Sequence, residues 1–211
     1  ETDLLNLVIN LNNNPKIHGI LVQLPLPKQI DENLITNSIL PHKDVDGFTA
    51  VNLGHLLSEN MIMAPATAMA VMKLIDSTGM KIGGKNAVVV GRSNIVGKPV
   101  ALMLLENNAT VTVCHSKTKN LAEHTKKADI LVVAVGKPKL ITKEMVKQGA
   151  VVIDVGINRV NGKVVGDVDF ENVKEIAGFI TPVPGGVGPM TIAMLMENTL
   201  KAMELAERIR T

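Results

Sequence analysis

The 211-residue sequence has no tyrosine and no tryptophan, and three phenylalanines are its only aromatic residues. A site that needs a phenol must therefore find it outside this chain. The single cysteine, Cys114, excludes a disulfide within the chain. Because Cys114 ends an apolar run, we expect a buried structural thiol, in a reducing compartment such as the cytoplasm.

Long apolar runs and concentrated charge of one sign are missing as well. The longest apolar stretches, such as Ile130 to Val135, fall far short of the roughly 20 residues that span a bilayer, so no membrane segment is expected. The formal net charge is only +2 and the basic residues are dispersed, which argues against a nucleic-acid partner. With 46% hydrophobic residues, the composition predicts a globular protein with a small-molecule ligand.

The chain opens with Glu1 and runs directly into an amphipathic helical pattern, with Thr2 as the candidate N-cap. We therefore expect that a further segment precedes this sequence in the complete protein. Three asparagines and Pro15 end this first helix.

A strand is predicted over Gly19 to Leu24, followed by an extended exit fixed by Pro25 and Pro27. Gln23 is the only polar side chain in this strand. Two interpretations are open: the amide bonds neighbouring backbone, or it points into a cleft at the carboxyl end of the strand.

The next segment contains a loop with two carboxylates, Asp44 and Asp46, followed by Gly47. Before it, Asp31 is expected to cap a short helix that finishes near Pro41. Asx turns alone would explain this loop. Alternatively, one carboxylate receives paired N–H donors from a heterocyclic ligand.

Downstream of residue 65, strands and helices alternate, which predicts an α/β fold with a parallel sheet. Helices are expected at 66–76, 98–106, 119–127 and 143–147, strands at 86–90, 110–114, 130–135 and 150–155, short β pieces at 163–165 and 178–180, and a last helix at 191–208. The apolar face of the last helix is expected to hold Ile192, Leu195, Met196, Thr199, Leu200 and Met203.

The first of these strands leads into a glycine turn, Gly91 to Gly97, and then into a helix, which is how a dinucleotide site begins. A pyrophosphate is expected on the backbone N–H groups of residues 93–97. The pattern departs from G-x-G-x-x-G, because Ser93 stands at the second glycine and Gly97 comes one residue late. An ordinary strand-to-helix connection is the alternative.

The second strand of the sheet runs into His115 to Lys119, a segment with no carboxylate for a ribose 2′-hydroxyl. Together with Arg92, this favours NADP over NAD, because a 2′-phosphate attracts such donors. A solvated basic loop is the competing interpretation. Gly136 and Gly156 follow the third and fourth strands, where a nucleotide can approach the backbone closely. The segment Thr181 to Thr191 is expected to be either a shaped ligand or domain surface or a purely structural turn.

Five ordered motifs of this sequence together resemble the bifunctional methylenetetrahydrofolate dehydrogenase/cyclohydrolase family. They are Gln23-Leu-Pro-Leu-Pro27, Lys43-Asp-Val-Asp-Gly-Phe48, Gly91-Arg-Ser-Asn-Ile-Val-Gly97, Cys114-His-Ser-Lys-Thr118 and the segment from Thr181 to Thr191. The resemblance implies NADP-dependent oxidation of 5,10-methylenetetrahydrofolate and hydrolysis of the methenyl product to 10-formyltetrahydrofolate. It also implies a homodimer and a folate cleft between a catalytic domain, 1–64 plus 191–211, and a Rossmann-like NADP-binding domain, 65–190.

The resemblance also implies residue roles. Gln23 and Asp46 would be the catalytic residues, with Gln23 bonding the catalytic lysine and Asp46 anchoring the amino edge of the pterin. Arg92 and Ser116 would hold the 2′-phosphate. The remaining cofactor contacts would be Gly91, Ser93, Ile95, Gly136 and Ile157, and the remaining substrate contacts Pro25, Gly185, Gly186 and Val187. No metal is implied.

Two departures from the family pattern are visible. The family's Y-x-x-x-K motif, which supplies the acid/base lysine, belongs upstream of the first helix and is missing here, so this exact chain is expected to be impaired in catalysis. The family's P-C-T-P-x-G segment reads Pro65-Ala-Thr-Ala-Met-Ala70, which favours a longer regular helix. Two other functions stay open: a non-catalytic NADP- or folate-binding module, and another two-domain NADP dehydrogenase, similar in layout to shikimate dehydrogenase.

Overall fold

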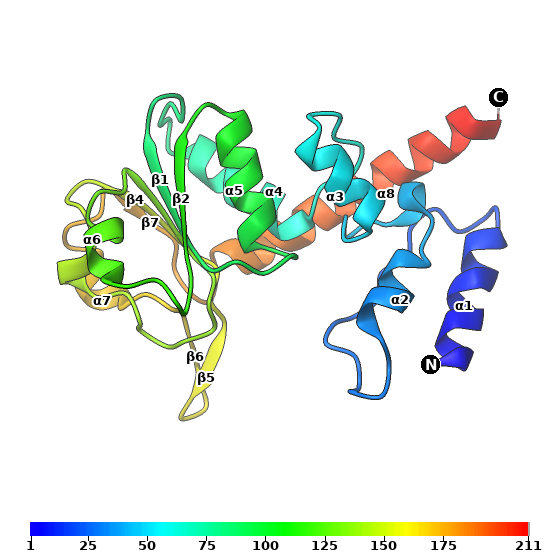
Figure 1. Cartoon of the computed structure of the whole chain (residues 1–211), viewed down its shortest axis with the longest axis horizontal. Coiled ribbons are helices and arrows are strands. Elements are labelled where there is room, and N and C mark those ends of the chain that lie inside the picture. The colour runs from blue at the N-terminus through cyan, green and yellow to red at the C-terminus, as the bar shows by residue number, and fades with distance from the viewer. Residues whose placement is uncertain (211) are drawn as a thin grey trace. The chain divides into compact units, whose positions relative to one another are not determined.

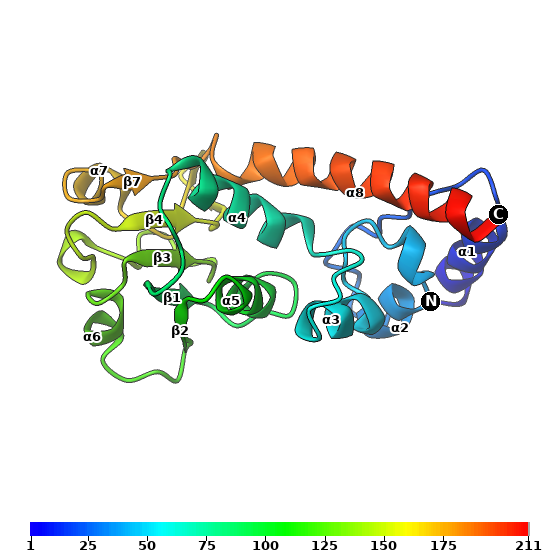
Figure 2. The same ribbon diagram turned by 90° about the horizontal axis from the view of Figure 1, so that it is seen from above.

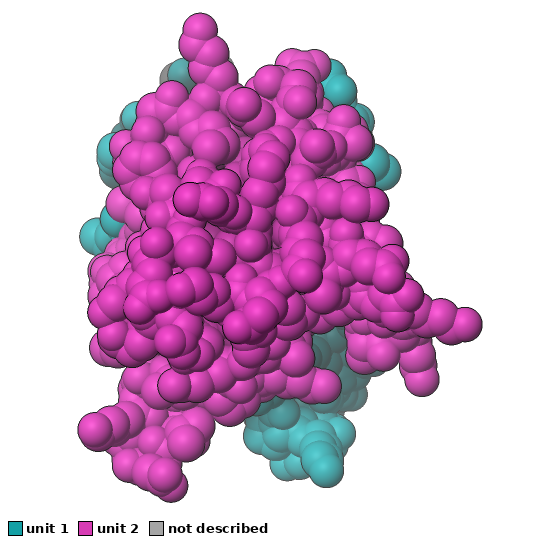
Figure 3. All heavy atoms as spheres, turned by 90° about the vertical axis from the view of Figure 1, so that its left-hand side faces the viewer, with its two compact units in different colours: residues 1–66, 193–211 teal, residues 67–192 magenta. Residues whose placement is uncertain are grey.

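The computed structural model of the chain describes residues 1–210 (Figure 1). It divides into two compact units, one formed by residues 1–66 and 193–211 and the other by residues 67–192 (Figure 3). None of the described helices is long and apolar enough to cross a membrane.

The 67–192 unit is built on a five-stranded, all-parallel sheet in the order β2-β1-β3-β4-β7. Its strands are β1 (Asn86–Val90), β2 (Thr110–Cys114), β3 (Ile130–Val133), β4 (Val151–Asp154) and β7 (Phe179–Ile180). β1, β3 and β4 consist almost wholly of buried apolar residues, as expected for strands covered on both faces. The predicted parallel α/β fold is confirmed.

Helices cover both faces of this sheet. α4 (Ala66–Ser77) and α5 (Gly97–Glu106) lie on one face, and α6 (Leu121–Thr125) and α7 (Phe170–Val173) lie on the other (Figures 1 and 2). α4 is one regular helix through Ala66, Ala68 and Ala70, as the alanine substitutions predicted. Cys114 is fully buried in the sheet core, which confirms the structural thiol, and burial raises the pKa of that thiol.

Some elements are shorter or of another type than predicted. The helix expected at 143–147 is only a 3₁₀ turn, η2 (Lys143–Met145), because Val146 is already extended. The strand expected to run to Val135 ends at Val133, and the Val135 N–H bonds the carboxylate of Asp167 instead of a neighbouring strand. An additional hairpin, β5 (Asn158–Val160) with β6 (Lys163–Val165), was predicted only in its second half.

The last helix, α8 (Val187–Arg210), begins four residues earlier than predicted. Pro189 is compatible with this start, since the first turn of a helix has N–H groups without intrahelical partners. The predicted apolar face is wrong for Ile192, Met196 and Leu200, which are 64%, 66% and 55% exposed. Besides Val187 at its start, the residues it buries are spaced four apart, namely Met194, Asn198, Ala202 and Ala206. Asn198 Nδ2 donates to the carbonyls of Val45 and Ala64, within the 1–66 and 193–211 unit.

The 1–66 and 193–211 unit is mainly helical. Its elements are α1 (Thr2–Asn13), α2 (Glu32–Asn37), η1 (Pro41–Lys43), α3 (Ala50–Leu57) and the part of α8 from residue 193 onward. Asp31 caps α2 as predicted, accepting from the N–H groups of Asn33 and Leu34. The prediction that Thr2 caps α1 is wrong, because Glu1 is the N-cap and makes no side-chain cap bond. One apolar cluster of this unit is centred on Val8, Ile20, Ile35 and Ile39.

The strand predicted over Gly19 to Leu24 does not form in the described part of the chain. Only Ile20 pairs, in a single parallel bridge to Asp44, with its N–H donating to the Lys43 carbonyl at 2.7 Å. Residues beyond Ile20 find no paired neighbour, and Pro25 and Pro27 have no N–H to donate. A strand needs a partner along its length, and this segment has one at a single position only.

Candidate functional site

Four loops leave the sheet of the 67–192 unit along one edge. Val90 is in register with Cys114 and with Val133, and Val133 is in register with Asp154, so four adjacent strands end at the same level. In the sheet, β2 lies on one side of β1 and β3 lies on the other, so the strand order reverses between β1 and β3. In parallel α/β sheets, ligands bind outside the carboxyl ends of the strands at such a switch point.

The backbone packs so closely around the glycine turn between β1 and α5 that two of its positions have no room for a side chain. Gly91 has φ +130°, and a Cβ there would lie 2.2 Å from the carbonyl oxygen of Ala134. A Cβ on Gly97 would lie 2.3 Å from the carbonyl oxygen of Gly91. The late glycine of the off-pattern motif is therefore needed for turn packing.

Ser93 has a structural task in this turn. Its Oγ accepts the N–H groups of Val96 and Gly97, each at 3.2 Å. Two of the five N–H groups that the sequence suggested for a pyrophosphate are thus bonded to Ser93. The serine in place of the second glycine thus bonds the N–H groups of Val96, the N-cap of α5, and of Gly97, its first residue.

Beside this turn lies a cavity of about 400 Å³, a size typical of small-molecule sites. Its lining comes from the ends of β1, β2 and β3 and from α6, and consists of Val90, Gly91, Arg92, His115, Ser116, Thr118, Leu121, Ala134, Val135, Lys137 and Leu140. Of the residues predicted to bind cofactor, the structure brings Gly91, Arg92 and Ser116 together here. Gly136 lies between two lining residues and has φ +64° with no neighbour that a Cβ would meet.

Ser116 stands in a tight turn that follows β2. The His115 N–H donates to Thr118 Oγ1 at 2.9 Å, the Thr118 N–H returns to the His115 carbonyl at 2.8 Å, and the Lys117 N–H donates to His115 Nδ1 at 3.1 Å. These bonds use Thr118 and His115 to fix the backbone. Arg92 and Ser116 are both exposed, so their donor groups are available to a ligand in the cavity.

A second, smaller cavity of about 90 Å³ lies in the same unit, between the loop after β4 and the start of α8. Ile157 of the β4 exit loop and the predicted turn Gly185, Gly186 and Val187 line it together. Ser93 and Ile95 line neither of these two cavities.

In the other unit, the loop that contains Asp44 and Asp46 treats the two carboxylates differently. Asp44 is buried and accepts the N–H groups of Phe48 and Thr49, at 3.2 and 2.8 Å, and Asn52 Nδ2 at 2.9 Å. Asp46 is half-buried and accepts no hydrogen bond within the described residues. Burial, with a smaller contribution from the charge of Asp44, raises the pKa of Asp46 to about 6.

Gln23 and Pro25, both predicted to contact substrate, are exposed. The Gln23 Nε2 donates to the carbonyl of Leu24 at 3.1 Å, which is the backbone interaction left open by the sequence. Within the described residues, no hydrogen bond joins Gln23 to Asp46.

No site role was predicted for three residues that the structure places near the cavities: the buried carboxylates Asp154 and Asp167, and Lys137, which lines the first cavity. A signal for Asp167 does exist: it stands between valines and a glycine, in Val165-Gly-Asp-Val168, where a charged residue is unusual.

Two family models match the chain. The tetrahydrofolate dehydrogenase/cyclohydrolase NAD(P)-binding domain matches residues 65–207, and the catalytic domain of the same family matches residues 1–46.

Curated proteins and solved structures agree with these matches. A bifunctional protein FolD from Nitrosospira multiformis is 60% identical over 207 residues, which cover 98% of this chain and 72% of that protein. The crystal structure of the bifunctional methylenetetrahydrofolate dehydrogenase/cyclohydrolase from Campylobacter jejuni superposes with a TM-score of 0.94 at 53% identity, covering 96% of this chain and 73% of that one. The Trypanosoma brucei dehydrogenase-cyclohydrolase, solved with NADP cofactor and an inhibitor, gives 0.93 at 44% identity, covering 98% and 73%.

Proposed function

The chain belongs to the tetrahydrofolate dehydrogenase/cyclohydrolase family, and we propose from this premise that its 67–192 unit binds NADP while the Asp46 loop of its other unit binds the folate. The bifunctional activity of the family is oxidation of 5,10-methylenetetrahydrofolate with NADP, followed by hydrolysis of the methenyl product to 10-formyltetrahydrofolate. Another kind of two-domain dehydrogenase is not supported, because both matching domain models are those of the folate family.

The first cavity fits the 2′-phosphate end of NADP. One observation supports this most strongly: the exit loops of three adjacent strands surround a space of about 400 Å³ that contains Arg92 and Ser116. The guanidinium can form charge-assisted bonds to a 2′-phosphate, and Ser116 can donate a further one. Among the described residues, no carboxylate lines the cavity to repel that phosphate.

When bound, NADP accepts the hydride released by the oxidation. The protein's own part in that step is positioning, since two rings must be held in contact for transfer. Gly185, Gly186 and Val187 form a wall of the second cavity and are proposed to place the reacting rings. Asp46, free of protein partners in the described structure, is proposed to accept N–H groups from the amino edge of the pterin in its ionised form. Gln23 and Pro25 are proposed to contact the folate beside it.

The cofactor assignment predicts a selective effect of Arg92→Ala. Because the 2′-phosphate loses a charge-assisted partner, NADP binding should weaken about 10- to 100-fold, while NAD binding should change less than about threefold. Calorimetric titration of the purified protein with each dinucleotide measures both constants. Lys98→Ala, which removes an exposed lysine bonded to Asn94, is the matched control and should leave the ratio unchanged. Equal weakening of NADP and NAD by Arg92→Ala would contradict the assignment.

The activity itself is tested on the native protein. Addition of 5,10-methylenetetrahydrofolate and NADP should produce NADPH absorbance, and methenyltetrahydrofolate should be hydrolysed. An absence of NADPH formation in a preparation that binds NADP would overturn the dehydrogenase assignment.

Two further properties are proposed, an oligomeric state and a cellular setting. A homodimer through the 67–192 unit follows from the resemblance to the family, and that unit exposes large apolar side chains such as Leu105 and Phe179. Sedimentation equilibrium of the native protein distinguishes a dimer from a monomer. A reducing cytoplasmic setting is consistent with the buried free thiol of Cys114.

A further inference from the structure

The loop after β3 is held by one buried carboxylate. Asp167 is fully buried, and its oxygens accept the backbone N–H groups of Val135, Gly136 and Lys137 at 2.7, 2.9 and 2.7 Å. Asn158 Nδ2 adds a fourth donor at 2.9 Å. Three consecutive N–H groups thus converge on one side chain, and two of these residues, Val135 and Lys137, line the first cavity.

The loop after β4 is held by a second buried carboxylate. Asp154, 3% exposed, accepts the N–H groups of Gly156 at 3.0 Å, Asp167 at 3.0 Å and Val168 at 2.9 Å. Asp154 and Gly156 line the second cavity. Because Asp154 also bonds the backbone of Asp167, the two carboxylates connect the walls of both cavities.

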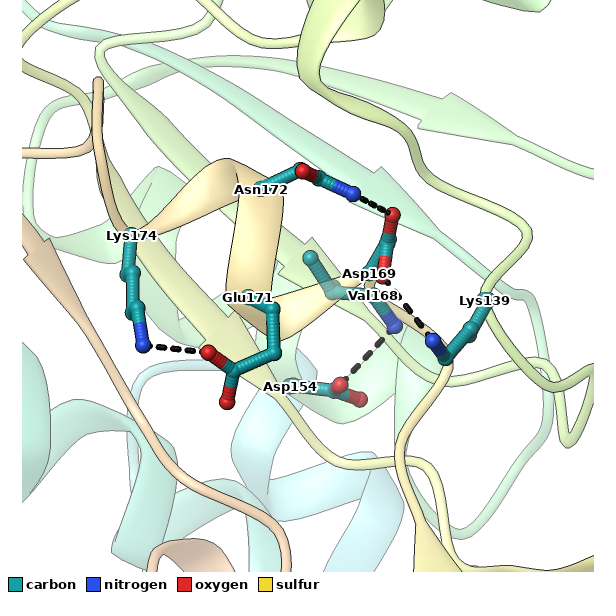
Figure 4. Close-up of polar contacts among 7 residues, drawn as sticks. All are labelled: Lys139, Asp154, Val168, Asp169, Glu171, Asn172 and Lys174. Atoms are coloured by element: carbon teal, nitrogen blue, oxygen red, sulfur yellow. Dashed lines mark hydrogen bonds and ion pairs between the residues drawn. The ribbon is translucent and has the colours of Figure 1, made fainter.

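Neither carboxylate has a cationic partner among the described residues, in contrast to other acidic residues nearby. Figure 4 shows Asp154 accepting the Val168 N–H, while Asp169 contacts Lys139 and Asn172, and Glu171 contacts Lys174. The glycines around the two carboxylates leave them room. A Cβ on Gly156 would lie 2.2 Å from the Asp167 Cγ, and one on Gly166 would lie 1.9 Å from an Asp154 oxygen.

We propose that Asp167 and Asp154 are positioning residues for the dinucleotide: Asp167 sets the wall of the cavity that contains Arg92, and Asp154 sets the wall of the second cavity. The inference rests on the proposed function, since it assumes that one dinucleotide uses both cavities. Neither carboxylate contacts the ligand in this account. Each holds backbone that does, because an ionised carboxylate can satisfy three or four converging donors.

Replacement of aspartate by asparagine tests this with almost no change in volume. An amide has one acceptor oxygen, and its NH₂ group would face donors, so the converging N–H groups lose partners. Asp167→Asn should weaken the binding of NADP, NAD and adenosine 2′,5′-bisphosphate at least tenfold. The ratio of the NADP and NAD dissociation constants should stay within twofold of that of the unaltered protein. This differs from Arg92→Ala, which changes that ratio.

Asp154→Asn should act mainly on the second cavity. We expect NADP binding to weaken at least tenfold. This factor should be at least five times the factor for adenosine 2′,5′-bisphosphate, which lacks the nicotinamide half of the dinucleotide. Glu171→Gln removes one negative charge from the same segment and is the matched control, with no change in any of the three constants.

Amide hydrogen exchange gives a readout that a general loss of stability would not produce. In Asp167→Asn, exchange at Val135, Gly136 and Lys137 should accelerate at least tenfold, while Val132 and Val133 within β3 keep their protection. If Asp167→Asn does not fold, Asn158→Ala removes one donor from Asp167 and should weaken NADP and NAD two- to fivefold alike.

The outcomes separate this proposal from the proposed function. If the unaltered protein does not bind NADP, the proposed function fails. If it binds NADP, but folded Asp167→Asn, or Asn158→Ala in its place, binds all three ligands within twofold and exchanges its loop amides at normal rates, the role of Asp167 is overturned and the cofactor assignment stands. Binding of NADP within twofold by folded Asp154→Asn would overturn the role of Asp154 in the same way.

Discussion

The protein has two pairs of closely spaced aspartates, one in each unit, and their hydrogen bonding differs. Asp154 and Asp167 are both buried and both fully occupied by backbone N–H groups and an asparagine amide. In the other pair only Asp44 is occupied, and Asp46 accepts no hydrogen bond among the described residues. A carboxylate that accepts hydrogen bonds from the protein stabilises the fold, whereas one that accepts none is available to a ligand.

Burial raises the pKa of a carboxyl group in each pair, and the two groups differ in whether hydrogen bonds oppose that rise. Burial raises the pKa of Asp154, and its three backbone hydrogen bonds oppose that increase. For Asp46 burial again raises the pKa, to about 6, and the charge of Asp44 adds to the increase. Nothing in the described structure favours the ionised form of Asp46, so a ligand that donates N–H groups would supply what the protein does not.

The largest expected effect is that of Asp44→Ala, because it leaves three donors around an empty space. We expect a loss of about 3 to 5 kcal/mol in the free energy of unfolding, from the unpaired N–H groups and the cavity. Urea denaturation measures it. A loss below about 1 kcal/mol would show that Asp44 is not the anchor of its loop, and would remove the contrast with Asp46.

A smaller loss is expected for Gly156→Ala, in the other pair. Its Cβ would lie 2.2 Å from the Asp167 carboxyl carbon, and that carboxylate cannot move without losing its four donors. We expect a destabilisation of about 2 kcal/mol, measured by urea denaturation. Gly83→Ala, with only ordinary contacts around a Cβ and no positive φ, is the control and should change stability little. Equal effects of the two substitutions would contradict the crowding at Asp167.

The smallest effect has the opposite sign. The folded pKa of Asp46 is raised from 3.8 to about 6, so its protonated form contributes stability that is present below about pH 4 and is lost as pH rises through 6. Asp46→Asn should therefore stabilise the protein at pH 7 by about 1 to 2 kcal/mol, and by almost nothing at pH 4. Thermal denaturation across this pH range tests it. A destabilisation at pH 7 would mean that Asp46 is a structural residue like Asp44.

Strong local patterns made most of the fold predictable from the sequence. The apolar runs that became β1, β2, β3 and β4 were placed to within two residues, since a buried parallel strand has few alternatives. The cavity residue Arg92 was singled out together with the absence of a carboxylate after the second strand, whereas Ser116 came from the resemblance to the family. Asp31 was found because its capping pattern is local.

Features that depend on contacts between distant segments were missed. The buried stripe of α8 could not be read from its apolar residues, because Asn198 anchors that stripe to carbonyls of Val45 and Ala64. The failed strand at Gly19 to Leu24 depended on a partner that pairs only with Ile20. Asp167 was missed although a charged residue is unusual among its apolar neighbours, because the three N–H groups that it binds belong to a loop about thirty residues earlier in the sequence.

The most direct test of the contrast between the aspartates is a pH titration of the aspartate carboxyl carbons by NMR, with and without 5-formyltetrahydrofolate, a stable reduced folate. We expect Asp46 to titrate near pH 6 in the free protein and its pKa to fall on folate binding. If Asp46 titrated at an ordinary aspartate pKa, unaffected by bound folate, it would not be the unoccupied carboxylate that this account assigns to the substrate.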